Sequence, residues 1–204
     1  MKFQKKDILW VSFLEFLFNG YNSPIISALQ KKLGMSRGAV YRHYKDKNDL
    51  FRAVIEKYFF KMHIQLLNNI DPDIKALQLI EHLHRKLQLF FLFSQREGLT
   101  QAIYLRYTGL LSQASKYYPD FLHNYKEVKI YIASYWEKAL IKSIEANEIK
   151  SDTDLQVMST LFTDIYMKDN KEYEVDAIFF HNMKNGLDEK TRLLLYLYDL
   201  IKLR

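Results

Sequence analysis

The sequence has no cysteine and few residues that interrupt a helix. The absence of cysteine from its 204 residues excludes disulfides, thiolate metal sites and cysteine nucleophiles, and it fits a reducing cytoplasm. Only six glycines and three prolines are present, which favours long helices. No internal repeat and no alternation strong enough for a sheet is found. We therefore predict an all-α chain that is long enough to bury a full core in one or two domains.

The sequence also lacks the motifs of common catalytic and metal sites. It contains no glycine-rich phosphate loop, no His-Glu-x-x-His pair and no nucleophile elbow. His82 and His84 are two positions apart on a predicted helix, so they point to different sides and do not suggest a shared metal. We therefore expect neither an enzyme nor a bound metal or cofactor.

No stretch of the sequence is suited to crossing a membrane. The basic start and the mostly apolar run from Ile8 to Phe18 resemble a signal peptide at first sight. However, Glu15 interrupts the run, no small-residue cleavage site follows, and the run is too short to span a bilayer. We predict a buried amphipathic helix over about residues 5–19, in a cytoplasmic protein without membrane contact.

The chain does have an excess of positive charge, and this excess is confined to one end. Residues 1–62 hold 12 Lys+Arg and 5 Asp+Glu, a net of +7, whereas residues 63–204 hold 18 and 19, a net of −1. This asymmetry is typical of a nucleic-acid-binding module attached to a neutral one, although a solvated basic face would give the same count.

The stretch from Leu33 to Asp49 has the features of a helix-turn-helix. Gly34 can end a helix at positive φ, and Ser36 is a good cap for the next helix, over about residues 37–44. That short helix is basic and carries the small residues Gly38 and Ala39. It would suit the DNA major groove, because arginine can bind guanine edges bidentately and small residues permit close approach.

The stretch over about residues 8–58 resembles the DNA-binding domain of TetR-family transcriptional regulators. The matching residues are Ile8, Leu9, Phe16, Gly20, Tyr21, Leu29, Gly34, Ser36, Gly38, Tyr41, His43, Tyr44, Lys47, Asp49 and Leu50. The resemblance implies a three-helix helix-turn-helix domain over 1–50, a connector helix over about 47–68, and a helical effector-binding and dimerisation domain over 51–204. The DNA-binding residues that it implies are Ser23, Ser36, Arg37, Gly38, Ala39, Tyr41, Arg42, His43 and Lys47.

These residues are expected to divide into base readers and backbone contacts. Arg37 and Arg42 are the candidates for reading bases. Tyr41, His43 and Lys47 would bind the phosphate backbone, which sets affinity and register rather than sequence preference. A plain surface or capping role for His43 is the alternative.

The chain departs from the family pattern at the start of its second helix. The family commonly has a Thr pair where this chain has Pro24-Ile25, and a small Ala where it has Gln30. We expect Ser23 to cap this helix ahead of Pro24 and to take over the phosphate contact. These departures keep a second hypothesis open, a protein-interaction module with a degenerate helix-turn-helix.

Beyond Met62 the sequence predicts further helices over about residues 74–94, 99–117, 120–147, 152–168 and 188–203. The resemblance implies a homodimer that forms through the last two helices, a pseudo-palindromic double-stranded operator, and a small-molecule effector that relieves repression. The candidate effector-binding residues are Tyr104, Tyr107, Tyr131, Tyr135, Phe162 and Tyr166. Aromatic residues at helical spacing are more often part of a core, so that alternative stays open.

Overall fold

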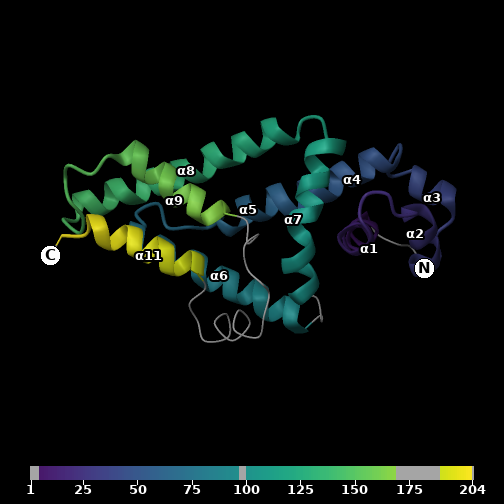
Figure 1. The fold of residues 1–204 in the computed structure, drawn as a ribbon, viewed down its shortest axis with the longest axis horizontal. Coiled ribbons are helices and arrows are strands. Elements are labelled where there is room, and N and C mark those ends of the chain that lie inside the picture. The colour runs from purple at the N-terminus through teal and green to yellow at the C-terminus, as the bar shows by residue number, and fades with distance from the viewer. Residues whose placement is uncertain (1–4, 97–99, 169–188, 204) are drawn as a thin grey trace. The chain divides into compact units, whose positions relative to one another are not determined.

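The computed structural model describes residues 5–96, 100–168 and 189–203, which belong to two compact units (Figure 1). The first unit is drawn from Met1–His63 and Leu99–Tyr125, and the second from Ile64–Gly98 and Lys126–Arg204. Within the described residues all regular structure is helical, apart from one isolated antiparallel bridge between Ile149 and Lys202. The predicted all-α class is confirmed. In the same residues, no helix has the length and apolar character needed to cross a bilayer.

The first unit contains the predicted helix-turn-helix and one helix from later in the chain. Its helices are α1 (Lys5–Asn19), α2 (Ile25–Leu33), α3 (Arg37–Tyr41), α4 (Lys47–Ile55) and α7 (Thr100–Tyr117). Fully buried side chains from α1, α2 and α4 form its core, among them Ile8, Leu29 and Leu50. Phe16 and Phe51 meet edge to face with ring centroids 5.0 Å apart. The apolar run that opens the sequence is therefore a core helix.

The connector helix is not a uniform α-helix. After α4 the chain makes a π-helical turn, η1 (Glu56–Phe60), and continues as α5 (Lys61–Leu66). Across this turn the Lys61 N–H donates to the carbonyl of Glu56, five residues earlier. The Tyr107 hydroxyl donates to the Tyr58 carbonyl at 2.7 Å. The sequence predicted one helix over about 47–68, which agrees in extent but did not include the π turn.

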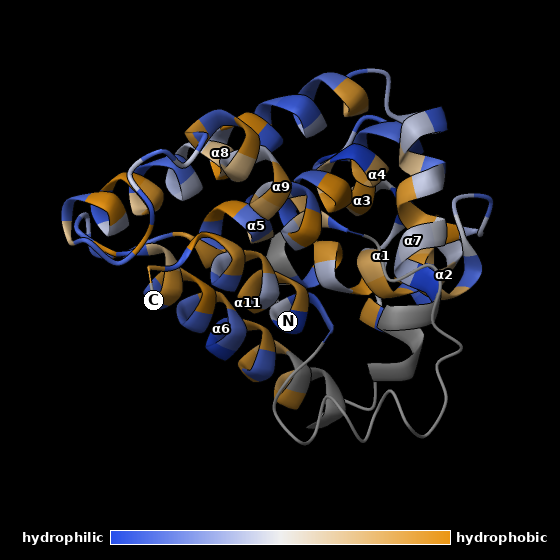
Figure 2. Cartoon of the chain, turned by 60° about the vertical axis from the view of Figure 1, so that its left-hand side comes forward, coloured by the Kyte–Doolittle hydropathy of each residue, from blue (hydrophilic) through white to orange (hydrophobic). Residues whose placement is uncertain are grey.

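The second unit is built mainly from four helices. They are α6 (Ala76–Arg96), α8 (Phe121–Glu145, which begins in the first unit), α9 (Leu155–Met167) and α11 (Glu189–Ile201). Trp136 is fully buried and stacks on Phe162 with ring centroids 4.8 Å apart. Nδ1 of His84 on α6 lies 3.0 Å from Oγ1 of Thr191 on α11. Figure 2 shows apolar and hydrophilic bands along both of these helices, as expected for helices with one face in a core.

Two helix ends lie three residues from their predicted positions. The helix predicted to begin near residue 152 begins at Leu155, because Asp154 is the cap and accepts from the Val157 N–H at 3.0 Å. The third helix, predicted to end near residue 44, ends at Tyr41. The His43 N–H bonds to the Val40 carbonyl three residues back, which tightens the chain into a turn.

Candidate nucleic-acid interface

Local backbone chemistry fixes where the helix-turn-helix turns. Gly34 has φ +64°, and its N–H bonds to the Gln30 carbonyl, which ends α2. Ser36 is extended, and its Oγ accepts from the Ala39 N–H at 3.2 Å, which begins α3. Both predicted features are confirmed, so these two residues determine the position of α3 along the chain.

One face of α3 packs into the first unit and the other is open to solvent. Val40 on the inner face is 1% exposed, and Tyr44, in the turn that follows the helix, is 4% exposed. Tyr41 is 38% exposed on the outside. A Cβ placed on Gly38 would meet no atom within 4 Å. The outer face of α3 is therefore free of packing constraints within the described part of the protein.

The rest of the predicted DNA-binding set lies around this open face, with two exceptions. Ser36, Arg37, Gly38, Arg42 and His43 are exposed and Ala39 is partly exposed. The guanidinium carbon of Arg37 lies 5.5 Å from the centroid of the Tyr41 ring. The exceptions are Ser23 and Lys47, which are engaged inside the unit.

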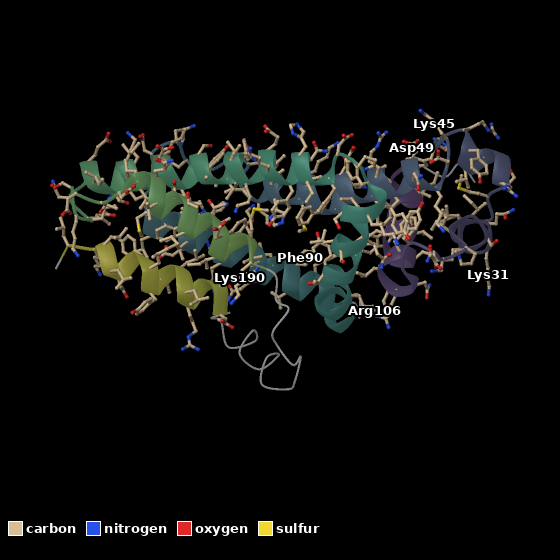
Figure 3. All side chains as sticks on the ribbon, turned by 45° about the horizontal axis from the view of Figure 1, so that its top comes forward. Lys31, Lys45, Asp49, Phe90, Arg106 and Lys190 are labelled. Atoms are coloured by element: carbon tan, nitrogen blue, oxygen red, sulfur yellow. The ribbon has the colours of Figure 1, made fainter. Side chains whose placement is uncertain are left out.

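The carboxylates nearest to α3 are engaged with α4 and the turn before it. Asp46 caps α4, since its Oδ1 accepts from the Asp49 N–H at 2.8 Å. Asp49 in turn pairs with Arg52 at 3.0 Å and accepts from the Lys45 N–H at 3.0 Å, and Figure 3 labels Lys45 and Asp49 at this turn. No ion pair found in the described residues involves Arg37. The outer face of α3 therefore keeps its positive charge.

Lys47 joins the loop before α2 to the start of α4. Its Nζ donates to the Ser23 carbonyl at 2.8 Å and lies 4.9 Å from the centroid of the Tyr21 ring. Burial lowers the pKa of the Lys47 ammonium. The Tyr21 hydroxyl also bonds to Asn48. Lys47 therefore has an internal structural role that the sequence did not predict. The hydrogen bond to Ser23 uses one of the three N–H donors of its ammonium group.

Ser23 does not cap α2, so that prediction was wrong. The cap position is held by Pro24, without any side-chain hydrogen bond. Ser23 is 5% exposed, and its Oγ is buried with no hydrogen-bond partner in the described structure. The Ser23 carbonyl makes the contacts instead, to the Ile25 N–H and to Lys47. The hydroxyl therefore lies inside the unit, away from any surface that a phosphate could reach.

Helix α7 holds the loop between α1 and α2, which the sequence did not reveal. The Tyr21 N–H donates to Oε1 of Gln113, and the rings of Tyr21 and Tyr117 stack with centroids 3.7 Å apart. Arg106, labelled in Figure 3, donates to the Phe18 carbonyl near the end of α1. About ninety residues separate these partners in sequence, so no local pattern could have indicated the contact.

The structure separates the candidate effector-binding residues. Tyr107 belongs to the first unit, where its hydroxyl binds a backbone carbonyl, and the side chain of Tyr104 lies outside the described residues. In the second unit the hydroxyls of Tyr131 and Tyr135 lie 3.0 Å apart, and both side chains are partly exposed. The hydrogen bond with Tyr135 raises the pKa of Tyr131, because it favours the protonated hydroxyl.

The remaining two candidates, Phe162 and Tyr166, are core residues of the second unit. Phe162 is fully buried and Tyr166 is 3% exposed, and burial raises the pKa of Tyr166. Their surroundings agree with the core alternative given above. An effector site built on Tyr131 and Tyr135 stays a prediction.

Comparison with known proteins identifies the helix-turn-helix. Residues 15–54 match the family described as bacterial regulatory proteins, tetR family. The matched residues run from within α1 to α4 and include the whole helix-turn-helix. Over 52 residues the chain is 38% identical to the HTH-type transcriptional regulator AcrR of Shigella flexneri. That match spans 26% of this chain and 24% of the relative.

Solved structures extend the resemblance in fold to the whole chain. A protein from Saccharomonospora viridis, assigned as a transcriptional regulator and solved with choline, covers 98% of this chain and 97% of its own, with 16% identity and a TM-score of 0.62. The SmeT–triclosan complex covers 96% of this chain and 88% of its own, at 14% identity and a TM-score of 0.57. A TerR/AcrR-family regulator from Aquifex aeolicus covers 96% of this chain and 95% of its own, with 20% identity and a TM-score of 0.52. These likenesses show that the helical fold of the chain as a whole is shared with these solved proteins.

Proposed function

We propose that the protein is a homodimeric, DNA-binding transcriptional repressor whose operator binding is relieved by a small molecule. The observation that carries the proposal is α3, a short helix fixed by a Gly34 turn and a Ser36 cap. Its inner face is buried, whereas its outer face is basic and open. The TetR-family match supports the same use of this surface. Contact with the chromosome would place the protein in the cytoplasm.

In this proposal the two α3 helices of a dimer enter successive major grooves of a pseudo-palindromic duplex, about 34 Å apart. Arg37 and Arg42 contact bases, while Ser36, Tyr41 and His43 contact the backbone. Gly38 and Ala39 allow close approach to the groove. Lys47 adds a backbone contact through the donors that Ser23 does not use. The buried Ser23 hydroxyl has no part in this interface.

Exposed apolar side chains on the last two helices support the proposed dimer. On α9, Val157 is 51% and Leu161 42% exposed; on α11, Tyr196 is 65% and Leu200 53% exposed. Large apolar side chains gathered on neighbouring helices favour a protein interface. We propose that α9 and α11 pair with their copies as a four-helix interface.

The ligands in two neighbouring structures support the proposal of an effector for this chain. One neighbour was solved with choline and another with triclosan. Tyr131 and Tyr135 are the candidates here, since each offers a ring face and a hydroxyl. To relieve repression, the effector must bind the DNA-incompetent state more tightly, and a coupling of about 1–3 kcal/mol would change operator affinity some 5–150-fold.

The proposal is tested by duplex binding of the purified full chain. A site selected from random duplexes should bind with an affinity that falls steeply as salt rises. Arg37→Ala should lower discrimination between the selected site and its variants by about 1–3 kcal/mol. Lys47→Ala should weaken all duplexes alike. Absence of salt-dependent binding to any duplex, even at low salt, would refute the proposal.

The alternative of a degenerate helix-turn-helix has one observation in its favour: the Ser23 hydroxyl, which was expected to bind a phosphate, is buried. Charge reversal of Arg37 and Arg42 separates the two hypotheses. The DNA-binding proposal requires this double variant to lose duplex binding, whereas an interaction module would keep its partner. The exposed basic residues on α3 favour the first outcome.

A further inference from the structure

We propose that Tyr41 is the positioning residue for Arg37, and that it holds the guanidinium ready to bind a guanine in the major groove. The inference rests on the proposed DNA-binding function and deepens it. It assigns one base contact to one side chain and names the residue that directs that side chain. Tyr41 then acts through its ring, separately from any backbone contact of its hydroxyl.

The geometry of α3 places the two side chains together. Arg37 and Tyr41 are four positions apart on one helix and so share a face. The guanidinium carbon lies 5.5 Å from the ring centroid, within the range of a cation–π contact. The Ser36 cap fixes the start of the helix, and the buried Val40 anchors its opposite face. The ring of Tyr41 therefore stays on the outer surface, beside Arg37.

The chemistry of this contact leaves the hydrogen-bonding edge of Arg37 available. An aromatic ring attracts the cation through its face, whereas the five N–H donors of a guanidinium lie in its own plane. A carboxylate partner would occupy two of those donors in a bidentate pair. Asp49, the carboxylate at the next turn, is paired with Arg52 instead. The ring thus restricts the motion of Arg37 while its donors remain free for O6 and N7 of a guanine.

Arg42 provides an internal comparison. It is exposed at the end of α3, and no ring contact found in the described residues places an aromatic face on it. Its side chain is therefore not restricted in the same way. If Tyr41 positions Arg37 specifically, the effect of a Tyr41 substitution on base discrimination should depend on the presence of Arg37 and not on the presence of Arg42.

The test compares Tyr41→Phe with Tyr41→Leu in the full-length protein. A preferred duplex is first selected with the wild type, and each guanine in it is then replaced in turn. Tyr41→Phe keeps the ring and should keep the wild-type discrimination at one guanine of each half-site. Tyr41→Leu should lower that discrimination roughly two- to fivefold, the equivalent of an exposed cation–π contact. The salt dependence should not change, because no phosphate contact of Arg37 is lost.

A double-mutant cycle gives a second readout. Arg37→Ala should remove the discrimination at that guanine and abolish the effect of Tyr41→Leu, whereas Arg42→Ala should leave it intact. Two outcomes would overturn the inference: equal discrimination in Tyr41→Leu and the wild type, or an equal loss in Tyr41→Phe and Tyr41→Leu. A wild type that binds no duplex would instead refute the proposed function itself, so the two failures are distinguishable.

Discussion

Two glycines of the helix-turn-helix have different physical roles although both are exposed. A Cβ on either glycine would meet no atom within 4 Å, so neither is required by packing. Gly34 has φ +64°, a conformation that costs other residues about 1–2 kcal/mol, whereas Gly38 lies within α3. Gly34 is therefore a requirement of the fold, and Gly38 is expected to be a requirement of the interface.

This contrast predicts opposite effects of the same substitution. Gly34→Ala should lower the free energy of unfolding by about 1–2 kcal/mol. Gly38→Ala should leave it unchanged or raise it by up to about 1 kcal/mol, because alanine favours the helix, but should weaken duplex binding by placing a methyl group against the groove. Denaturant unfolding and duplex titration measure the two effects. Unimpaired duplex binding by Gly38→Ala would contradict the proposed close approach.

Tyr44 should make the protein sensitive to high pH. Burial, with a smaller contribution from Asp49, raises the pKa of Tyr44 to about 12, against about 10 in an unfolded chain. Between these pH values the folded state keeps a proton that the unfolded state has released, so stability falls as pH rises. The slope from this group is at most about 1.4 kcal/mol per pH unit.

We therefore expect Tyr44→Phe to reduce the loss of stability between pH 10 and 12. Urea unfolding of the full chain at several pH values would measure the slope. Tyr41→Phe, which removes a hydroxyl from the exposed ring on α3, is the matched control and should follow the wild type. A slope for Tyr44→Phe equal to that of the wild type would show that Tyr44 does not contribute.

At the scale of elements, helices and their local ends were predictable where the signal lies in adjacent residues. The Gly34 turn and the Ser36 cap were correctly predicted, because the cap bonds to a backbone N–H only three positions away. Ser23 failed as a cap because its side chain is buried inside the unit. Lys47, a residue distant in sequence, binds the Ser23 carbonyl there. The π turn at Glu56–Phe60 also escaped prediction, since the apolar pattern of the connector suits an ordinary helix equally well.

The stack between Tyr21 and Tyr117 predicts that α7 stabilises the helix-turn-helix. Tyr117→Leu should lower the melting temperature by about 2–5 °C, because an aromatic pair contributes about 0.5–1.5 kcal/mol beyond its buried area. Differential scanning calorimetry of the full chain would measure this change. Phe93→Leu, at an exposed position on α6 without a stacked partner among the described rings, should leave the melting temperature close to the wild-type value.

At the scale of the whole molecule, the sequence indicated an all-α protein in which one end carries the positive charge. It predicted a boundary after residue 50, and that functional division stays a prediction. The compact units are divided differently, because Leu99–Tyr125 packs with the helix-turn-helix. Such a grouping depends on contacts such as Gln113 with Tyr21, which composition and periodicity do not record.

The proposed dimer predicts that charge on α9 and α11 separates the protomers. The double variant Leu161→Glu and Leu200→Glu should raise the dimer dissociation constant by about tenfold or more. Burial of each exposed leucine in the interface would contribute about 1.5–3 kcal/mol to dimer stability. Operator affinity should fall as the dimer dissociates. Sedimentation velocity would measure the dissociation.

Leu89→Glu on α6 is the matched control for this variant. Leu89 is 63% exposed and also apolar, but it lies outside the proposed interface. It should leave the dimer intact. Dissociation by Leu89→Glu and not by the α9–α11 variant would place the interface elsewhere.

The π turn in the connector helix has a consequence for the history of the chain. A hydrogen bond that spans five residues instead of four accommodates one additional residue within a continuous helix. A single-codon deletion within Glu56–Phe60 could therefore be absorbed by conversion to an ordinary α-helical turn. A relative with an unbroken α-helix here should align with this chain only if a one-residue gap is opened in that stretch.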